Sequence, residues 1–215
     1  MLRLVLPKAN PLRILCLGAH SDDIEIGCGC TILRLLSETA NTEVYWIVFS
    51  GSSVRKKEAR ASARLFLRGA SERTVTVLGY RDGFFPHKSH LIKADFEKLK
   101  RRFSPDVIFT HYRNDLHQDH RTICELTWNT FRNHWILEYE IPKYDGDLGA
   151  PNFFVPVDAR RCENKVEYLL RAFSSQRSKH WFTTDLFRSL LRLRGMESNS
   201  PSGFAEAFYC SKVTL

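Results

Sequence analysis

The chain alternates between two patterns of hydrophobic and polar residues. Short continuous apolar runs, which are typical of strands buried on both faces, are separated by longer segments with apolar residues at helical spacing. We expect strands at residues 12–17, 44–49, 74–78, 106–111, 135–141 and 153–157, and a final apolar segment at residues 204–209. We expect helices at about residues 27–38, 55–67, 91–103, 119–131, 163–173 and 183–194.

This alternation predicts an α/β fold in which a mostly parallel sheet is covered by helices on both faces. A chain of 215 residues is long enough for one large core and short for two. The sequence contains no internal repeat and no convincing interdomain linker. We therefore expect a single domain over residues 1–215.

Two polar segments follow two of the expected strands. Gly18-Ala19-His20-Ser21-Asp22-Asp23 comes after the first strand, and His117-Gln118-Asp119-His120 comes after the strand at residues 106–111. Open α/β sheets build their sites at the carboxyl edge, where both segments would emerge. Either segment alone has a simpler explanation, because an Asp-Asp pair often caps a helix and a histidine pair often lies on the surface. Two such segments at one sheet edge favour a shared site.

The residue types in these segments are those of a catalytic metal centre. Two histidines and a carboxylate can bind zinc and leave one position open for water. His20 and Asp23 are three residues apart, which suits two ligands from one loop or first helical turn. His120 is the natural third ligand from the other segment.

The remaining polar residues then have roles beside the metal. Asp22 is left unligated and close, so it would act as the general base that accepts a proton from water. His117 would face the pocket as a polarising or proton-donating group. Asp119 could hydrogen-bond an imidazole and fix its tautomer.

The formal net charge of +8 does not point to nucleic acid. The basic residues are scattered through helical stretches, and no nucleic-acid-binding motif accompanies them. We expect no nucleic-acid partner, and a surface that mildly favours an anionic small-molecule substrate.

The six cysteines are expected to be reduced and mostly buried. The segment from Met1 to Lys8 is too short and too interrupted for a signal peptide, and no apolar run approaches the roughly 20 residues of a transmembrane helix. We therefore expect a cytoplasmic protein without a transmembrane segment. Cys28-Gly29-Cys30 lies near the expected site, but its spacing is poor for a ligand pair.

The two polar segments resemble the paired Ala-His-Pro-Asp-Asp and His-Pro-Asp-His motifs of the PIG-L/LmbE family. This resemblance implies a Rossmann-like three-layer fold and a zinc-dependent N-acetylglucosaminyl deacetylase, although another divalent metal would fit the same ligands. The resemblance covers most of the chain through weaker matches, which are Gly27-Cys28-Gly29, Arg55 with Glu58, Leu78-Gly79-Tyr80-Arg81-Asp82, Ser175-Gln176 and Ala205-Glu206-Ala207-Phe208.

The resemblance implies the metal ligands and general base named above, and it adds two residues that contact the sugar, Arg55 and Asp82. It also implies that His117 stabilises the tetrahedral oxyanion or protonates the leaving amine. Without the resemblance, Arg55 reads as a solvated residue in a basic run and Asp82 as a turn residue before a glycine.

The chain departs from the family pattern at four positions. Ser21 and Gln118 replace the prolines of the two motifs, and neither position should carry chemistry. Ile24 stands where many members have glutamate, and Asp115 stands where some have tyrosine. The last two changes concern the substrate contacts, not the metal ligands.

We therefore expect a hydrolase that removes the N-acetyl group from an acetylated amino sugar or sugar conjugate and releases acetate. A hydrolase of another acyl group or amine is one alternative. A non-catalytic sugar- or nucleotide-binding module is the other, although the chain lacks the glycine pattern of dinucleotide-binding folds. Phe84 and Phe85 either form a sugar-stacking surface or pack in the core.

Overall fold

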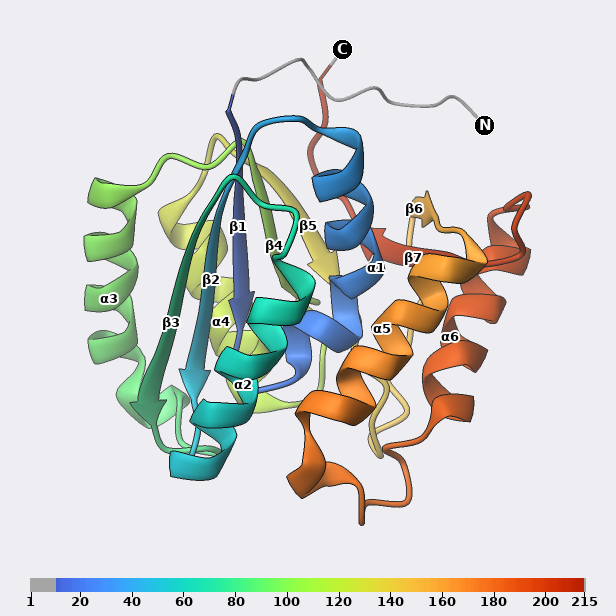
Figure 1. Ribbon diagram of the computed structural model, residues 1–215. Coiled ribbons are helices and arrows are strands. Elements are labelled where there is room, and N and C mark those ends of the chain that lie inside the picture. The colour runs from blue at the N-terminus through green and yellow to red at the C-terminus, as the bar shows by residue number, and fades with distance from the viewer. Residues whose placement is uncertain (1–10, 215) are drawn as a thin grey trace.

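Seven strands form one sheet in the order β3-β2-β1-β4-β5-β7-β6 in the computed structural model, which describes residues 11–214 (Figure 1). The amino-terminal segment on which the signal-peptide expectation rests lies outside these residues. The strands are β1 (Leu12–Gly18), β2 (Thr42–Ser50), β3 (Glu72–Tyr80), β4 (Val107–His111), β5 (Trp135–Tyr139), β6 (Phe153–Pro156) and β7 (Ala205–Tyr209). Strands β1 to β5 are parallel, whereas β7 pairs antiparallel with both β5 and β6.

The helices are α1 (Asp23–Glu38), α2 (Ser53–Phe66), α3 (Ser89–Arg102), α4 (Gln118–Thr130), α5 (Ala159–Ala172) and α6 (Thr184–Glu197), with 3₁₀ turns at Pro86–Lys88 and Ser174–Gln176. The expected α/β class with a mostly parallel sheet is confirmed. One boundary that differs from expectation is the start of α5, four residues before Glu163. The reason is local, because Asp158 caps this helix by accepting a hydrogen bond from the backbone N–H of Arg161 at 2.7 Å.

Each central strand is buried on both faces by alternating side chains. In β1, Ile14 and Cys16 join the core under α1, α2 and α5, whereas Leu15 and Leu17 join the core under α3 and α4. Figure 1 shows α4 behind the sheet and α3 to its left beside β3, with α1, α2 and α5 in front and α6 beside α5. The continuous apolar runs thus correspond to strands that lie between two helical layers.

The strand order places a topological switch between β1 and β4. The chain proceeds from β1 to β2 and β3 on one side and then returns to β4 on the other side of β1. Such a switch leaves a crevice outside the carboxyl ends of the two strands. Both polar segments follow these ends, at the lower edge of the sheet in Figure 1.

Helix α1 approaches the sheet closely at Gly27. A Cβ atom there would lie 2.1 Å from Cδ2 of Tyr139, so only glycine fits against this ring. The helix is also kinked at the next residue, Cys28, whose φ of −141° is not helical. This packing fixes the start of α1, where the expected site residue Asp23 lies in the first turn and Asp22 directly precedes it.

Among the helices of residues 11–214, none combines the length and hydrophobicity that crossing a bilayer would require.

Candidate metal centre

Side chains from the β1–α1 loop and from the start of α4 meet at the β1/β4 crevice. His20 and Asp23 come from the first segment and His120 from the first turn of α4. Nδ1 of His20 lies 3.1 Å from Nε2 of His120 and 3.4 Å from Oδ2 of Asp23. Nε2 of His120 lies 3.6 Å from Oδ1 of Asp23. The structure thus brings together the three residues that the sequence predicts as metal ligands.

These separations suit one tetrahedral ion. Metal–ligand bonds of about 2.0–2.1 Å at tetrahedral angles place ligand atoms about 3.4 Å apart. The two histidine nitrogens are 3.1 Å apart, and Asp23 faces them with different oxygens, Oδ2 at 3.4 Å from His20 and Oδ1 at 3.6 Å from His120. Asp23 and His120 are buried, and His20 is partly buried.

The protonation of His120 also suits a ligand. Its Nδ1 lies 2.9 Å from Oδ2 of Asp115 and donates to it, because an ionised carboxylate can only accept. Burial and the neighbouring His111 lower the pKa of His120 to about 3, which keeps the ring neutral. Its Nε2 lone pair is therefore directed to the site.

His20 lies among carboxylates that favour a positive charge. Burial alone would lower its pKa, but Asp23, Asp119 and Asp82 together raise it well above the usual value. Nε2 of His20 lies 3.0 Å from Oδ1 of Asp82 and 3.4 Å from Oδ2 of Asp119. A divalent cation would supply positive charge in place of the proton, so the donor set fits a metal ion chemically as well as geometrically.

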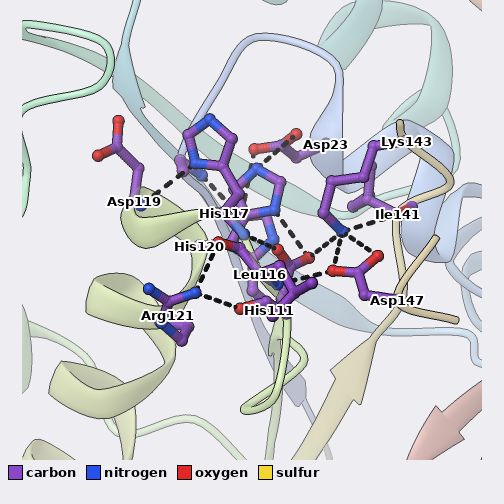
Figure 2. A network of polar contacts seen from close by, with 12 residues as sticks. Asp23, His111, Leu116, His117, Asp119, His120, Arg121, Ile141, Lys143 and Asp147 are labelled. Atoms are coloured by element: carbon purple, nitrogen blue, oxygen red, sulfur yellow. Dashed lines mark hydrogen bonds and ion pairs between the residues drawn. The ribbon is translucent and has the colours of Figure 1, made fainter. Parts of the chain in front are cut away.

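His117 lies beside the same cluster (Figure 2). Its ring centroid is 4.8 Å from that of His20 and 4.5 Å from that of His120. Its Nδ1 accepts from the backbone N–H of Asp119 at 3.2 Å and so caps α4. Burial and the charge of His20 lower its pKa. His117 is also close enough to His20 and His120 for the three to form an alternative ligand set.

Asp22 is buried next to the candidate ligand Asp23 and precedes α1. Burial raises its pKa, and the charge of Arg55 opposes this shift. Nη2 of Arg55 lies 2.9 Å from Oδ1 of Asp22, and its Nη1 lies 3.1 Å from Oε2 of Glu58. Arg55, the expected sugar contact, is thus turned toward the expected base.

Asp119 connects the centre to the loop after β3. Its carboxylate accepts from the backbone N–H of Gly83 at 2.7 Å and of Phe85 at 3.1 Å. Phe85 is fully buried in the core on the α3/α4 side, whereas Phe84 is 39% exposed. Of the two phenylalanines, only Phe84 is therefore available to a ligand. The other expected sugar contact, Asp82, lies in this loop with an exposed side chain.

Two residues of the centre were missed by sequence reasoning. His111 is fully buried at the end of β4, where its ring stacks 3.9 Å from that of His120. Its Nε2 accepts from the backbone N–H of Ala19 at 2.9 Å and lies 3.2 Å from Oδ2 of Asp23. Asp115 was noted only as a departure from a tyrosine. The available signals were a histidine at the last position of a buried strand and an acid five residues before the ligand histidine.

The six cysteines are unpaired, and all except Cys210 are buried. In the part of the chain that the structure describes, none belongs to a group of side chains spaced to hold a metal ion. Cys28 and Cys30 point to the core, so this segment is structural.

The sequence and the fold both match known proteins. The sequence model of the PIG-L family, described as GlcNAc-PI de-N-acetylase, matches residues 15–131, which is more than half of the chain. The chain therefore belongs to this family, as the two motifs indicated. It is 27% identical to the uncharacterized deacetylase YaiS of Escherichia coli K12 over 154 residues, which are 64% of this chain and 79% of YaiS.

Solved structures share the fold at lower sequence identity. The N,N'-diacetylchitobiose deacetylase of Pyrococcus horikoshii aligns with a TM-score of 0.71 at 21% identity, over 93% of this chain and 83% of the other. The 4-carboxy-2-hydroxymuconate hydratase GalB of Pseudomonas putida KT2440 aligns with a TM-score of 0.70 at 14% identity, over 94% and 97%. Because the fold carries more than one reaction, the function has to be argued from the family and the site.

Proposed function

We propose that this chain is a zinc-dependent deacetylase that hydrolyses the N-acetyl group of an amino sugar or sugar conjugate. The observation that carries the proposal is the convergence of His20, Asp23 and His120 at tetrahedral spacing, with Asp22 beside them. Family membership and the deacetylases among the similar proteins support the same reaction. We also propose that residues 1–215 form one catalytic domain, since one sheet includes strands from Leu12 to Tyr209.

In this proposal His20, Asp23 and His120 hold the metal ion. When bound, the ion polarises the acetyl carbonyl and lowers the pKa of water near it. Asp22 takes a proton from the attacking water, and Arg55 orients this carboxylate and favours its ionised form by opposing the rise in pKa that burial causes. The water oxygen adds to the carbonyl carbon, the C–N bond breaks, and the amine and acetate leave.

His117 and the β3 loop complete the site. The imidazole of His117 donates an N–H to the developing oxyanion, and the leaving amine takes its proton either from the imidazolium form of His117 or from Asp22, which has accepted a proton from water. Asp119 holds the loop at residues 83–85 by accepting two backbone N–H groups. Asp82, whose side chain is exposed at the edge of the centre, is available to sugar hydroxyls.

The test is acetate release from N-acetylglucosamine conjugates by the purified protein. We expect release that stops after chelation and returns with zinc. A parallel series with propionyl or butyryl groups and with non-sugar amines tests the acyl and amine specificity. Stoichiometric metal without amide hydrolysis on any of these substrates would contradict the proposal.

A further inference from the structure

The loop after β5 makes a tight turn that ends beside the metal centre. The turn spans residues 143–146, with the backbone N–H of Gly146 donating to the carbonyl of Lys143 at 3.4 Å. Gly146 has a φ of +62°, a conformation that glycine adopts without strain. The turn brings Lys143 and Asp147 together, and their side chains form an ion pair at 2.7 Å.

Lys143 extends from this turn to Asp115. Its Nζ lies 2.8 Å from Oδ2 of Asp115, and it also donates to the carbonyl of Ile141 at 3.2 Å. The Lys143 side chain is 14% exposed and that of Asp115 is 1% exposed, so water screens this pair poorly. Figure 2 shows Lys143 beside Ile141 and Asp147, on the side of the cluster away from Asp119.

Asp115 is the acceptor that orients His120. The same Oδ2 atom that Lys143 contacts receives the Nδ1–H of His120 at 2.9 Å. Its Oδ1 accepts from the backbone N–H of His117 at 2.8 Å. One carboxylate thus fixes the tautomer of a candidate ligand and the backbone at the start of α4.

Asp147 makes a second contact between the turn at residues 143–146 and the loop that leads from β4 to α4. It accepts from the backbone N–H of Leu116 at 2.7 Å, while its other contact is the ammonium group of Lys143. The loop that leads from β4 to α4 is therefore fixed to the loop after β5 at Asp115 and at Leu116.

We propose that Lys143 is a positioning residue that strengthens metal binding by holding Asp115 against His120. This inference rests on the proposed function, because it takes His120 as a metal ligand. The ammonium group compensates the charge of a buried carboxylate that accepts from the ligand histidine. Without the Lys143 ammonium group, Asp115 can still accept hydrogen bonds from His120 and His117. It loses the positive charge beside it and the contact with Lys143 that helps to orient its carboxylate. Partners of this kind, one shell removed from the metal, typically change metal affinity 10- to 100-fold.

The experiment measures metal affinity and does not depend on catalysis. Zinc affinity is determined by competition with a chromophoric chelator for the wild type, Lys143→Met and Lys100→Met. Methionine keeps the length and most of the apolar volume of the lysine side chain. Lys100 is an exposed residue of α3 and serves as the matched control. We expect Lys143→Met to bind zinc about 10- to 100-fold more weakly, with Lys100→Met unchanged.

A spectroscopic measurement separates positioning from general destabilisation. The absorption bands of Co²⁺ bound in place of zinc report ligand geometry, and we expect them to shift or weaken in Lys143→Met only. Asp147→Asn, which keeps Lys143 but removes its second countercharge, is the second variant if Lys143→Met fails to fold. We expect it to weaken zinc binding in the same direction by a smaller factor.

The possible results separate the two proposals. A wild type that binds no stoichiometric zinc overturns the proposed function. A wild type that binds zinc, together with a folded Lys143→Met of equal affinity and unchanged Co²⁺ spectrum, leaves the proposed function intact and overturns the role of Lys143. If Asp147→Asn is the only variant that folds, a zinc affinity equal to that of the wild type also overturns the role of Lys143.

Discussion

The guanidinium group of Arg55 lies against the carboxylate of Asp22, with Nη2 2.9 Å from Oδ1. Glu58 holds the other side of the guanidinium at 3.1 Å, and Glu58 itself accepts from the backbone N–H and the hydroxyl group of Ser175. Arg55 therefore reaches the centre from a fixed position on α2. Its position gives it a role in the ionisation of Asp22 in addition to any contact with the sugar.

Replacing Arg55 with methionine is expected to move the pH dependence of hydrolysis. Burial raises the pKa of Asp22 and Arg55 opposes this, so loss of Arg55 raises that pKa further. Because the base must be ionised, the acid limb of the kcat/KM profile should move to higher pH, and activity near neutral pH should fall. Lys57→Met, at an exposed position of the same helix, is the control. An acid limb at an unchanged pH, with only KM raised, would restrict Arg55 to substrate binding.

Asp22→Asn should separate catalysis from metal binding. The amide can no longer accept a proton from water, so we expect kcat to fall by about 10²- to 10⁴-fold. Zinc content, measured by atomic emission on the same protein, should stay at the wild-type value because Asp22 is not a proposed ligand. Near-normal turnover in this variant would show that another group acts as the base.

Asp23→Ala should remove both the metal and the activity. Asp23 provides a candidate ligand oxygen, and it also accepts from the backbone N–H of His20 at 2.6 Å. We expect this variant to lose both its stoichiometric zinc and its release of acetate. Zinc added at a concentration that restores the chelated wild type should not restore acetate release in the variant. Retention of one tightly bound ion per chain would favour the set of His20, His117 and His120 as the ligands instead.

Glu25 is expected to make folding stability depend on pH. It is 1% exposed, and burial raises its pKa from 4.5 to about 8. Between these two values the folded state retains a proton that the unfolded state has lost, so stability decreases as pH rises. The slope for one such proton is about 1.4 kcal/mol per pH unit, an upper value for this site.

Urea unfolding at pH 5.5, 6.5 and 7.5 would measure this slope for the metal-free wild type and for Glu25→Gln. The neutral amide does not titrate, so the free energy of unfolding of the variant should lack this decrease with pH. The variant should therefore become more stable relative to the wild type as the pH rises. Equal slopes in the two proteins would exclude Glu25 as the source.

The sheet could be predicted from the sequence because burial on both faces leaves a direct signal. The continuous runs at residues 12–17 and 44–49 correspond to β1 and β2. The sequence pattern predicts the start of α1 at Gly27, whereas the helix begins four residues earlier, at Asp23. Asp23-Ile24-Glu25-Ile26 alternates polar and apolar residues, a pattern that conceals a helical turn in which all four side chains are buried.

The candidate ligands could be predicted because each lies close to others of its kind in the sequence. The partners that orient them could not. Lys143 lies 28 residues from Asp115 in a loop without regular structure, and nothing in its neighbourhood marks it as a partner of a buried carboxylate. In the sequence His111 is simply a polar residue at the end of a strand. Its ring stacks on that of His120 only because the folded loop between β4 and α4 brings the two rings together.

The pairing of β1 with β4 has a consequence for biosynthesis. The donor atoms come from segments about a hundred positions apart, and they meet only after Ile14, Leu15 and Cys16 have paired with Val107, Ile108 and Phe109. A nascent chain that has not yet emerged past His120 holds an incomplete set of donors, so tight capture of the ion must await assembly of the central sheet. With His20, Asp23 and His120 as the proposed ligands, metal uptake would report completed folding and would not trigger it.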